Sequence, residues 1–230
     1  MFRFKQFAIE QDRCPMKVGT DGVLLGAWAR VEATDRHLLD IGTGTGLIAL
    51  MLAQRCVQAQ VTGVDIDDVS QACANVSASP WADRVTMIQS PVQQFVAREP
   101  FDLIVSNPPY FVDSLRCPDA GRATARHAIE LTFSDLHDAV IRLLAPDGRF
   151  CLILPPAEME LFLSGCRALY PVRRVEVHST PTGDVRRVML ELQCAPIQPF
   201  ATTHLTIGTG AHEQYTDEYR FLTRDFYLKF

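Results

Sequence analysis

The sequence lacks the patterns by which secreted, membrane-spanning and metal-binding proteins are usually recognised. Its seven cysteines include no C-x-x-C pair, and its six histidines show neither H-x-x-x-H nor a mixed Cys/His spacing, so we expect reduced thiols and no metal site. No apolar run is long enough to cross a bilayer, and we expect no membrane partner. The first residues, Met1–Phe7, alternate aromatic and polar side chains without the continuous apolar core of a secretion signal, which favours a cytoplasmic protein.

The chain also lacks internal repeats, low-complexity tracts and an excess of positive charge. Hydrophobic residues make up 47% of its 230 residues and charged residues 21%, which is ordinary globular composition and suits one α/β domain over residues 1–230. The formal net charge of −5 argues mildly against a nucleic-acid partner, although local clusters of arginine can overcome it. Nothing in the sequence points to an obligate protein partner.

Strand-like and helix-like segments alternate through the middle of the chain. Short apolar runs are followed by segments with helical spacing, and this alternation indicates a mostly parallel sheet with right-handed crossovers. The expected strands are 38–41, 61–65, 85–89, 102–106 and 149–154, and the expected helices are 47–55, 68–78, 133–144 and 158–169.

Two later strands break this alternation. Residues 172–178 and 186–193 are separated by too short a link for a crossover helix, which predicts an antiparallel hairpin at the sheet edge. We therefore expect an α/β fold with a doubly wound, mostly parallel seven-stranded sheet and an antiparallel edge hairpin. Beyond a proline-rich linker, residues 196–230 form a C-terminal addition with a candidate strand at 204–207 and a helix at 213–230.

The most informative stretch is Asn107-Pro108-Pro109-Tyr110, which follows the apolar strand. Two consecutive prolines cannot continue a strand, so the chain leaves as a stiff loop at the carboxyl end, the edge where open α/β sheets bind ligands. The Asn107 and Pro108 oxygens and the Tyr110 ring suit a planar group that bears an NH₂, because oxygens accept its hydrogens and the ring stacks on its face. A simple diproline turn, with Tyr110 in ordinary packing, is the alternative.

A second candidate site is the glycine-rich loop Asp40-Ile41-Gly42-Thr43-Gly44-Thr45-Gly46, which joins a strand to a helix. Glycines there permit positive φ and let the backbone approach a ligand closely. Gly46 comes one residue too early for the dinucleotide fingerprint G-x-G-x-x-G, so the loop fits S-adenosylmethionine better than NAD. Asp65 ends the next strand, where a carboxylate can accept both hydroxyls of a ribose, and it supports either adenosine cofactor.

Together these features resemble the class I, Rossmann-like methyltransferases. The NPPY segment is similar to the motif of enzymes that methylate planar NH₂ groups, namely adenine N6, guanine N2 or the amide nitrogen of glutamine. A closer resemblance, to the bacterial tRNA1(Val) adenine N6-methyltransferase family, covers almost the whole chain. The matching segments are Phe4–Phe7, Asp12–Cys14, Met16–Trp28 and the tail around Tyr215, Tyr219 and Phe226–Leu228.

The resemblance implies that S-adenosylmethionine is the cofactor and that tRNA is the partner, methylated at N6 of an anticodon-loop adenosine. It also implies roles for particular segments. Residues 1–30 would cover the cofactor, with Lys17 and Thr20 at its methionine end. Asn107, Pro108 and Tyr110 would act on the amine, and Asn107 would also face the cofactor.

The family often carries an aspartate at the end of the third strand, where it accepts a hydrogen bond from the cofactor's adenine. Here Pro91 stands in that place, and Ser90 or a backbone carbonyl is the candidate substitute. Three arginines after the NPPY segment, Arg116, Arg122 and Arg126, are candidate contacts to RNA phosphates, with solvated surface charges as the alternative.

Other functions stay open from the sequence. The same chemistry fits a DNA adenine, a guanine N2 of ribosomal RNA or a glutamine in a protein as acceptor. An NAD(P)-dependent oxidoreductase is disfavoured by the glycine spacing. A non-catalytic RNA-binding module is disfavoured by the intact NPPY segment and Asp65 and by the acidic net charge.

Overall fold

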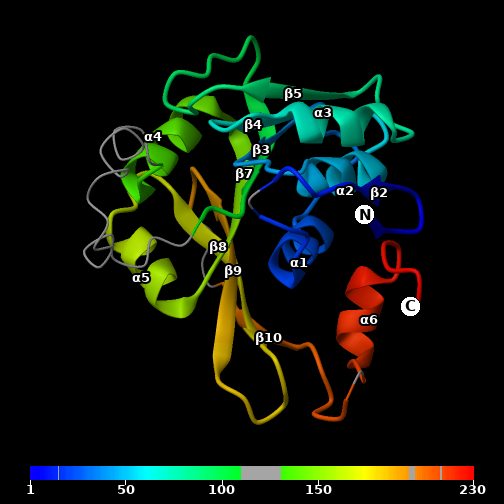
Figure 1. Ribbon diagram of the computed structural model, residues 1–230. Coiled ribbons are helices and arrows are strands. Elements are labelled where there is room, and N and C mark those ends of the chain that lie inside the picture. The colour runs from blue at the N-terminus through cyan, green and yellow to red at the C-terminus, as the bar shows by residue number, and fades with distance from the viewer. Residues whose placement is uncertain (15, 110–130, 197–199, 213) are drawn as a thin grey trace, which may run out of the picture.

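Within the described residues, eight strands form one central sheet in the order β10-β8-β9-β7-β6-β3-β4-β5 (Figure 1). The computed structural model describes residues 1–14, 16–109, 131–196, 200–212 and 214–230. The strands of the sheet are β3 (His37–Ile41), β4 (Gln60–Asp65), β5 (Val85–Gln89), β6 (Phe101–Ser106), β7 (Leu144–Leu154), β8 (Tyr170–His178), β9 (Val185–Gln193) and β10 (Thr202–Thr206). The helices are α1 (Thr20–Trp28), α2 (Leu47–Arg55), α3 (Ser70–Ser77), α4 (Phe133–Leu143), α5 (Pro156–Ser164) and α6 (Asp217–Thr223). A small hairpin of β1 (Phe2–Arg3) and β2 (Ala8–Ile9) precedes them.

The strand order reverses beside β3. This strand pairs in parallel with β4 on one side and with β6 on the other. The chain runs outward from β3 through β4 to β5 and then returns to form β6 on the opposite side of β3. The carboxyl ends of β3 and β6 therefore flank a topological switch point, the place where open α/β sheets bind their ligands.

Helices cover both faces of the sheet, so the central strands are apolar on both sides. In β3, Leu38 packs in the core with α1, α2 and α6, whereas Leu39 packs in the core with α4 and α5. Figure 1 shows these two groups of helices on opposite sides of the sheet. The side chains of successive residues point to opposite faces, and burial of both faces explains the continuous apolar runs of the sequence. None of the described helices is both long and apolar enough to cross a membrane.

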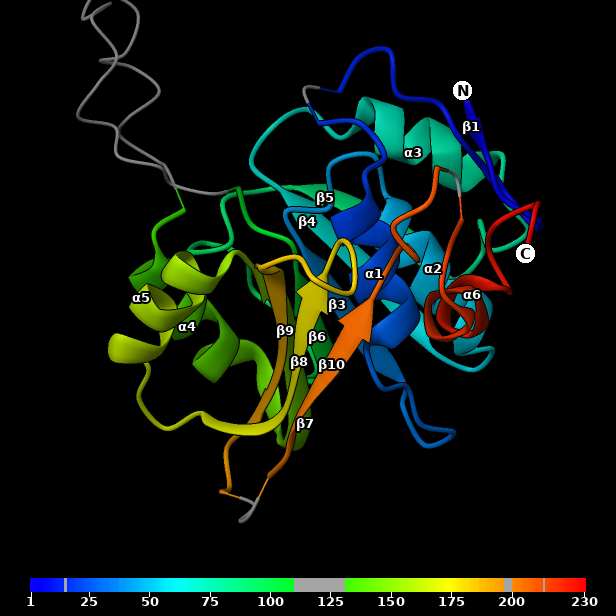
Figure 2. The same cartoon turned by 90° about the horizontal axis from the view of Figure 1, so that it is seen from below.

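The predicted α/β class with a mostly parallel, doubly wound sheet is confirmed, with one correction. The sheet has eight strands and not seven, because β10 pairs in parallel with β8 and leaves the β8–β9 hairpin one strand in from the edge. Figure 2 shows β10 lying beside β8. β10 overlaps the candidate strand expected at 204–207, although only its Leu205 is buried.

The predicted C-terminal helix at 213–230 is shorter in the structure, where α6 ends at Thr223. The residues after it pack against the N-terminal hairpin. Lys5 donates its backbone N–H to the Phe226 carbonyl at 2.8 Å, and the Phe4 ring lies 6.0 Å from the Tyr227 ring. The two ends of the chain thus share one aromatic cluster beside α2 and α3.

Candidate functional site

The glycine loop folds over the end of β4. Gly42, Gly44 and Gly46 have φ angles of 74°, 54° and 81°, in the left-handed region that favours glycine. The backbone N–H groups of Gly42 and Thr43 both donate to the Val64 carbonyl, at 2.8 and 3.2 Å. A Cβ atom added at Gly42 or Gly44 would meet no atom of the described residues within 4 Å. The loop is therefore tied down on one side and open on the other, where a ligand can approach its backbone.

Asp40 lies beneath this loop and is fully buried. Its Oδ2 accepts a hydrogen bond from the Thr43 hydroxyl at 2.7 Å and from the Ala49 N–H at 3.2 Å, which joins the loop to the first turn of α2. Burial raises the pKa of this carboxyl to about 7, against the hydrogen bonds from Thr43 and Ala49 that lower it. In this structure, Asp40 shapes the loop from below.

Asp65, at the end of β4, is half-buried and reaches the same loop. Its Oδ2 accepts the Gly44 N–H at 2.8 Å, and its Oδ1 accepts the Asp67 N–H at 3.0 Å. Ser90 follows β5 directly and donates its backbone N–H to the Asp65 carbonyl at 2.7 Å. The structure thus brings the predicted residues of three strand ends together beside the glycine loop.

Asn107, which directly follows β6, lies beside these residues. The ladder between β3 and β6 ends at the pair Ile41 and Ser106, and the Ser106 hydroxyl donates to the Ile41 carbonyl at 2.9 Å. Gly42 and Asn107 consequently leave the sheet side by side at the switch point. The Oδ1 atom of Asn107 is buried and has no hydrogen-bond partner among the residues that the structure describes. Pro108 is buried and Pro109 is exposed.

Several predicted residues are not part of this described group. Tyr110, Arg116, Arg122 and Arg126 lie outside the described residues. Lys17 and Thr20 are described, and both are exposed where the chain enters α1.

Asn75 on α3 connects the N-terminal segment to the glycine loop, and the sequence analysis missed it. Its side chain is 3% exposed. Its Oδ1 accepts the N–H of Glu10, and its Nδ2 donates to the carbonyls of Glu10 and Thr45, each at 2.9 Å. The one sequence signal for this role was an asparagine inside a predicted helix, because helix interiors disfavour asparagine.

The N-terminal segment also passes close to the acidic strand end. Burial, followed by the negative charges of Asp65 and Asp68, raises the pKa of the Cys14 thiol. A further link runs from the Arg13 N–H to the Gln71 side chain on α3, at 3.3 Å. Residues 10–14 therefore lie across α3, next to the carboxyl end of β4.

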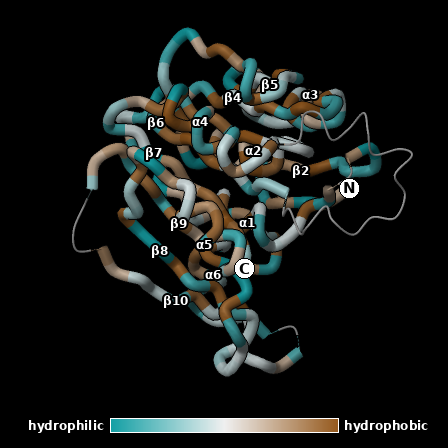
Figure 3. The backbone as a smooth tube through the Cα atoms, turned by 90° about the vertical axis from the view of Figure 1, so that its left-hand side faces the viewer, coloured by the Kyte–Doolittle hydropathy of each residue, from teal (hydrophilic) through white to brown (hydrophobic). Residues whose placement is uncertain are grey.

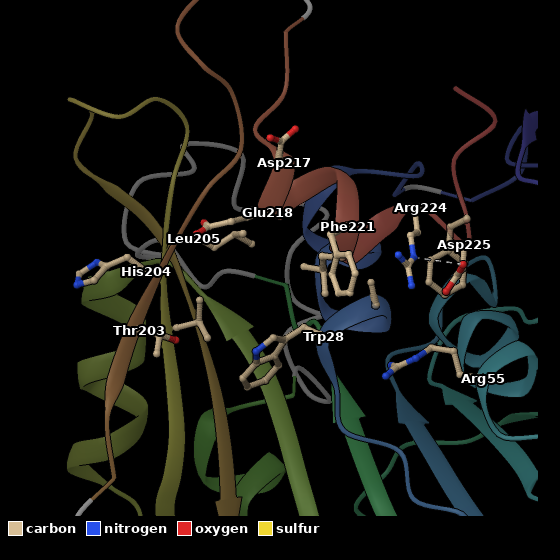
Figure 4. Close-up of a pocket in the computed structure, with 14 residues that line it drawn as sticks. Trp28, Arg55, Thr203, His204, Leu205, Asp217, Glu218, Phe221, Arg224 and Asp225 are labelled. Atoms are coloured by element: carbon tan, nitrogen blue, oxygen red, sulfur yellow. Dashed lines mark ion pairs between the residues drawn. The ribbon is translucent and has the colours of Figure 1, made fainter. Parts of the chain in front are cut away.

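A pocket of about 750 Å³ lies elsewhere, between α1, β10 and α6 (Figure 4). Its lining includes Trp28 and Arg55, at the C-terminal ends of α1 and α2, whereas the glycine loop precedes α2. None of the predicted site residues that the structure describes lines this pocket. Hydrogen-bonding groups at the switch point, and not cavity volume, mark the candidate site.

The chain matches the family model for the methyltransferase small domain over residues 21–134. It is 44% identical over 234 residues to the tRNA1(Val) (adenine(37)-N6)-methyltransferase of Parabacteroides distasonis, a match that covers 99% of this chain and 98% of that protein. It is 47% identical over 231 residues to the protein of the same name from Phocaeicola vulgatus, with coverage of 99% and 97%. The chain belongs to the tRNA1(Val) (adenine(37)-N6)-methyltransferase family. The family predicted from the sequence is thereby confirmed.

Solved structures of more distant proteins share the fold. A predicted O-methyltransferase from Agrobacterium tumefaciens superposes with a TM-score of 0.63 at 17% identity, covering 90% of this chain and 96% of that one. A putative class I S-adenosylmethionine-dependent methyltransferase from Listeria monocytogenes gives a TM-score of 0.55 at 18% identity, covering 80% and 62%. At these identities the likeness concerns the fold, and it agrees with the predicted class I architecture.

The substitution Asn75→Asp tests the connection between the N-terminal segment and the glycine loop. It replaces two N–H donors with an acceptor and leaves the carbonyls of Glu10 and Thr45 without partners. We expect the free energy of unfolding, measured in urea, to fall by about 2–6 kcal/mol, because each of the two carbonyls left unpaired costs about 1–3 kcal/mol. Amide hydrogen exchange should become faster at residues 8–12.

The matched control is Cys73→Ser, at an exposed position of the same helix. It should leave both measurements unchanged. Wild-type exchange rates at residues 8–12 in Asn75→Asp would show that the amide does not hold this segment.

Asp40 makes stability depend on pH. Its folded pKa of about 7 lies above the unfolded value of about 3.9, so the folded state binds the proton more tightly and loses stability as the pH rises through this range. The stability of the wild type relative to Asp40→Asn should fall between pH 4 and pH 7 by up to about 4 kcal/mol and then level off. Urea unfolding of both proteins at several pH values measures this difference, and parallel curves would contradict it.

Proposed function

We propose that the protein transfers a methyl group from S-adenosylmethionine to N6 of an adenine in tRNA1(Val). The family relationship supports this substrate, because the relatives are named tRNA1(Val) (adenine(37)-N6)-methyltransferase. The chemistry is carried by one observation, the buried and unpartnered Oδ1 of Asn107 next to the glycine loop. A buried acceptor without a partner costs about 1–3 kcal/mol, so this position favours an incoming N–H donor such as the exocyclic amine of a base.

The residues around the loop fit S-adenosylmethionine. Gly42 and Gly44 leave an open side along which a nucleoside can lie against the backbone. Each oxygen of Asp65 accepts one backbone N–H, and carboxylate oxygens have further lone pairs for the two hydroxyls of a ribose. Ser90, beside Asp65, is our candidate for the adenine end, and Lys17 and Thr20 are our candidates for the methionine end. Gly46 and Asp40 hold the loop in shape.

When bound, S-adenosylmethionine supplies a methyl group on a positively charged sulfonium. The Asn107 side-chain oxygen and the Pro108 carbonyl would each accept one hydrogen of the adenine amine, which withdraws its lone pair from the ring and orients it. Such positioning supplies up to about 7–11 kcal/mol of a reaction barrier. No strong base is needed, because the methylated ammonium is acidic and loses its proton readily. Stacking of the base on Tyr110 stays a prediction.

We infer that residues 1–30 cover the bound cofactor. The hydrogen bonds of Asn75 to Glu10 and Thr45 support this, as does the position of Cys14 near Asp65. Residues 196–230 are an addition that contributes β10 and α6 and packs against the N-terminal hairpin.

The RNA side of the proposal rests on the substrate's chemistry. A target base must leave its stack, which costs least in a single-stranded loop such as the anticodon loop. We propose that Arg116, Arg122 and Arg126 hold the flanking phosphates. Because tRNA is a cytoplasmic molecule, we expect the protein to act in the cytoplasm. We also expect it to need no obligate protein partner.

Incubation with labelled S-adenosylmethionine tests this function. Unmodified tRNA1(Val), its variant with the target adenosine changed to guanosine, 16S and 23S ribosomal RNA, duplex DNA and a glutamine peptide would be compared as acceptors. We expect label only in tRNA1(Val), as N6-methyladenosine at one anticodon-loop position mapped by nuclease digestion and mass spectrometry. Label in another acceptor would replace the substrate assignment, and absence of label in all of them would remove the proposed activity.

The variant Asn107→Ala should lose methyl transfer while the cofactor still binds. Removal of one positioned acceptor should lower kcat by at least about 10²-fold, because oriented polar groups of this kind contribute that much. The dissociation constant for S-adenosylmethionine, measured by calorimetry, should change less than about fivefold. Retained turnover in this variant would exclude Asn107 from the reaction.

Asp65→Asn separates cofactor binding from loop structure. The asparagine keeps an oxygen for the Gly44 N–H but loses the charge that strengthens hydrogen bonds to ribose. We expect affinity for S-adenosylmethionine to fall at least about tenfold by calorimetry, since hydrogen bonds to charged groups contribute about 1.5–3 kcal/mol. Asp67→Asn, at an exposed neighbour, is the matched control and should bind as the wild type does. Equal affinities for both variants would remove the ribose assignment.

A further inference from the structure

Away from the candidate site, three metal-ligating side chains converge on one face of the β8–β10 pair. Glu176 and His178 are two residues apart on β8 and so point to the same side of the sheet, and the parallel register places His204 of β10 opposite Glu176. Their ligand atoms all lie within 4.8 Å of one another. Figure 4 shows the His204 ring directed away from the pocket into which Leu205, its neighbour on β10, points.

We propose that Glu176, His178 and His204 bind one Zn²⁺ ion, with water as the fourth ligand. The Nε2 of His178 lies 3.2 Å from the Nδ1 of His204, and this Nδ1 lies 3.7 Å from Oε2 of Glu176. Zinc bonds of about 2.0–2.2 Å in a tetrahedron place neighbouring ligand atoms about 3.3–3.6 Å apart. The three atoms therefore lie within a few tenths of an ångström of that spacing along two edges of the tetrahedron.

The surrounding groups orient these ligands. The Nδ1 of His178 lies 2.8 Å from the Gly183 carbonyl. A carbonyl can only accept, so this Nδ1 carries the proton and the Nε2 lone pair faces the cluster. A metal-bound histidine usually has this arrangement, with its second nitrogen donating to a backbone carbonyl.

Glu176 is oriented from its other side. Arg174 donates to Oε1 at 3.2 Å and also pairs with Glu160 at 3.1 Å, which leaves Oε2 toward the histidines. The positive charge of Arg174 is thus shared between two acids, Glu176 and Glu160.

The alternative without a metal is a hydrogen bond between the two histidines, with Glu176 paired to Arg174 and His204. Two imidazoles and one carboxylate are a donor set that suits zinc, with a position left for water. The His204 side chain is 61% exposed, so the ion has a route in from solvent. The spacing E-x-H with a third ligand far along the chain is no recognised metal motif, and only strand pairing brings the three together.

The ion joins the edge strand β10 to β8 and so fastens the C-terminal addition to the sheet. Its binding energy adds to folding stability, because the unfolded chain does not hold the three ligands together. It takes no part in the proposed methyl transfer, since none of its ligands lies among the groups at the switch point.

The test uses the full-length protein, freed of metal with a chelator and titrated with ZnCl₂ by calorimetry at neutral pH. We expect one equivalent to bind, and Zn²⁺ at a hundred times its dissociation constant should raise the Tm by roughly 5–10 °C. Co²⁺ in its place should give the intense visible absorption of a tetrahedral site.

The variants His178→Ala, His204→Ala and the isosteric Glu176→Gln should each lower zinc affinity more than about tenfold. The Tm of each metal-free variant, compared with that of the metal-free wild type, checks folding. His212→Ala, at an exposed histidine outside the cluster, is the matched control and should bind zinc as the wild type does. Absence of saturable binding at one equivalent, or binding that survives loss of either cluster histidine, would overturn the proposal.

Discussion

The parallel pairing of β3 with both β4 and β6 is the constraint on which the candidate site depends. It brings three carboxyl ends to one edge, and short hydrogen bonds then fix the loops that leave them. The Val64 carbonyl accepts from the start of the glycine loop, and the Ser106 hydroxyl binds the last carbonyl of β3. These bonds place Gly42 and Asn107 side by side, which neither loop can achieve alone. A ligand bound between the two loops, as we propose, would meet backbone on one side and an amide oxygen on the other.

The two aspartates at neighbouring strand ends, Asp40 and Asp65, differ in burial and in what their oxygens contact. Asp40 is fully buried, and burial penalises its charged form and raises its pKa to about 7, although Thr43 and Ala49 donate hydrogen bonds to it. Asp65 is half-buried one strand away and accepts two backbone N–H groups. The first holds the loop from below and the second presents oxygens at its rim. The two identical side chains thus differ in depth, and recognition of a ligand by Asp65 is part of our proposal.

The ends of the chain are built into the same region. Asn75 pairs with the backbone of Glu10 much as a neighbouring strand would, and the same amide holds the glycine loop through Thr45. Lys5 bonds to the carbonyls of Arg224 and Phe230 at the other end of the chain. The N-terminal segment is therefore held between the loop and the C-terminal tail.

In Figure 3, β8 in the outer part of the sheet shows hydrophilic stretches, which come from Arg173, Arg174, Glu176 and His178.

The sequence by itself determined the class of fold and the strand ends that carry the candidate site. Apolar runs and proline and glycine breaks are local signals, and they gave α2 its observed bounds and marked the glycine loop, Asp65 and Asn107 as candidate site residues. Other features arose only from tertiary structure. The sequence predicted a candidate strand at 204–207, but the place of β10 at the sheet edge, parallel to β8, follows only from the pairing of the two strands. The roles of Asn75 and of the cluster of Glu176, His178 and His204 depend on contacts between residues far apart in the chain. Such contacts produce no periodic pattern in the sequence, because they depend on residues that come together in the folded chain and not on a fixed spacing along it.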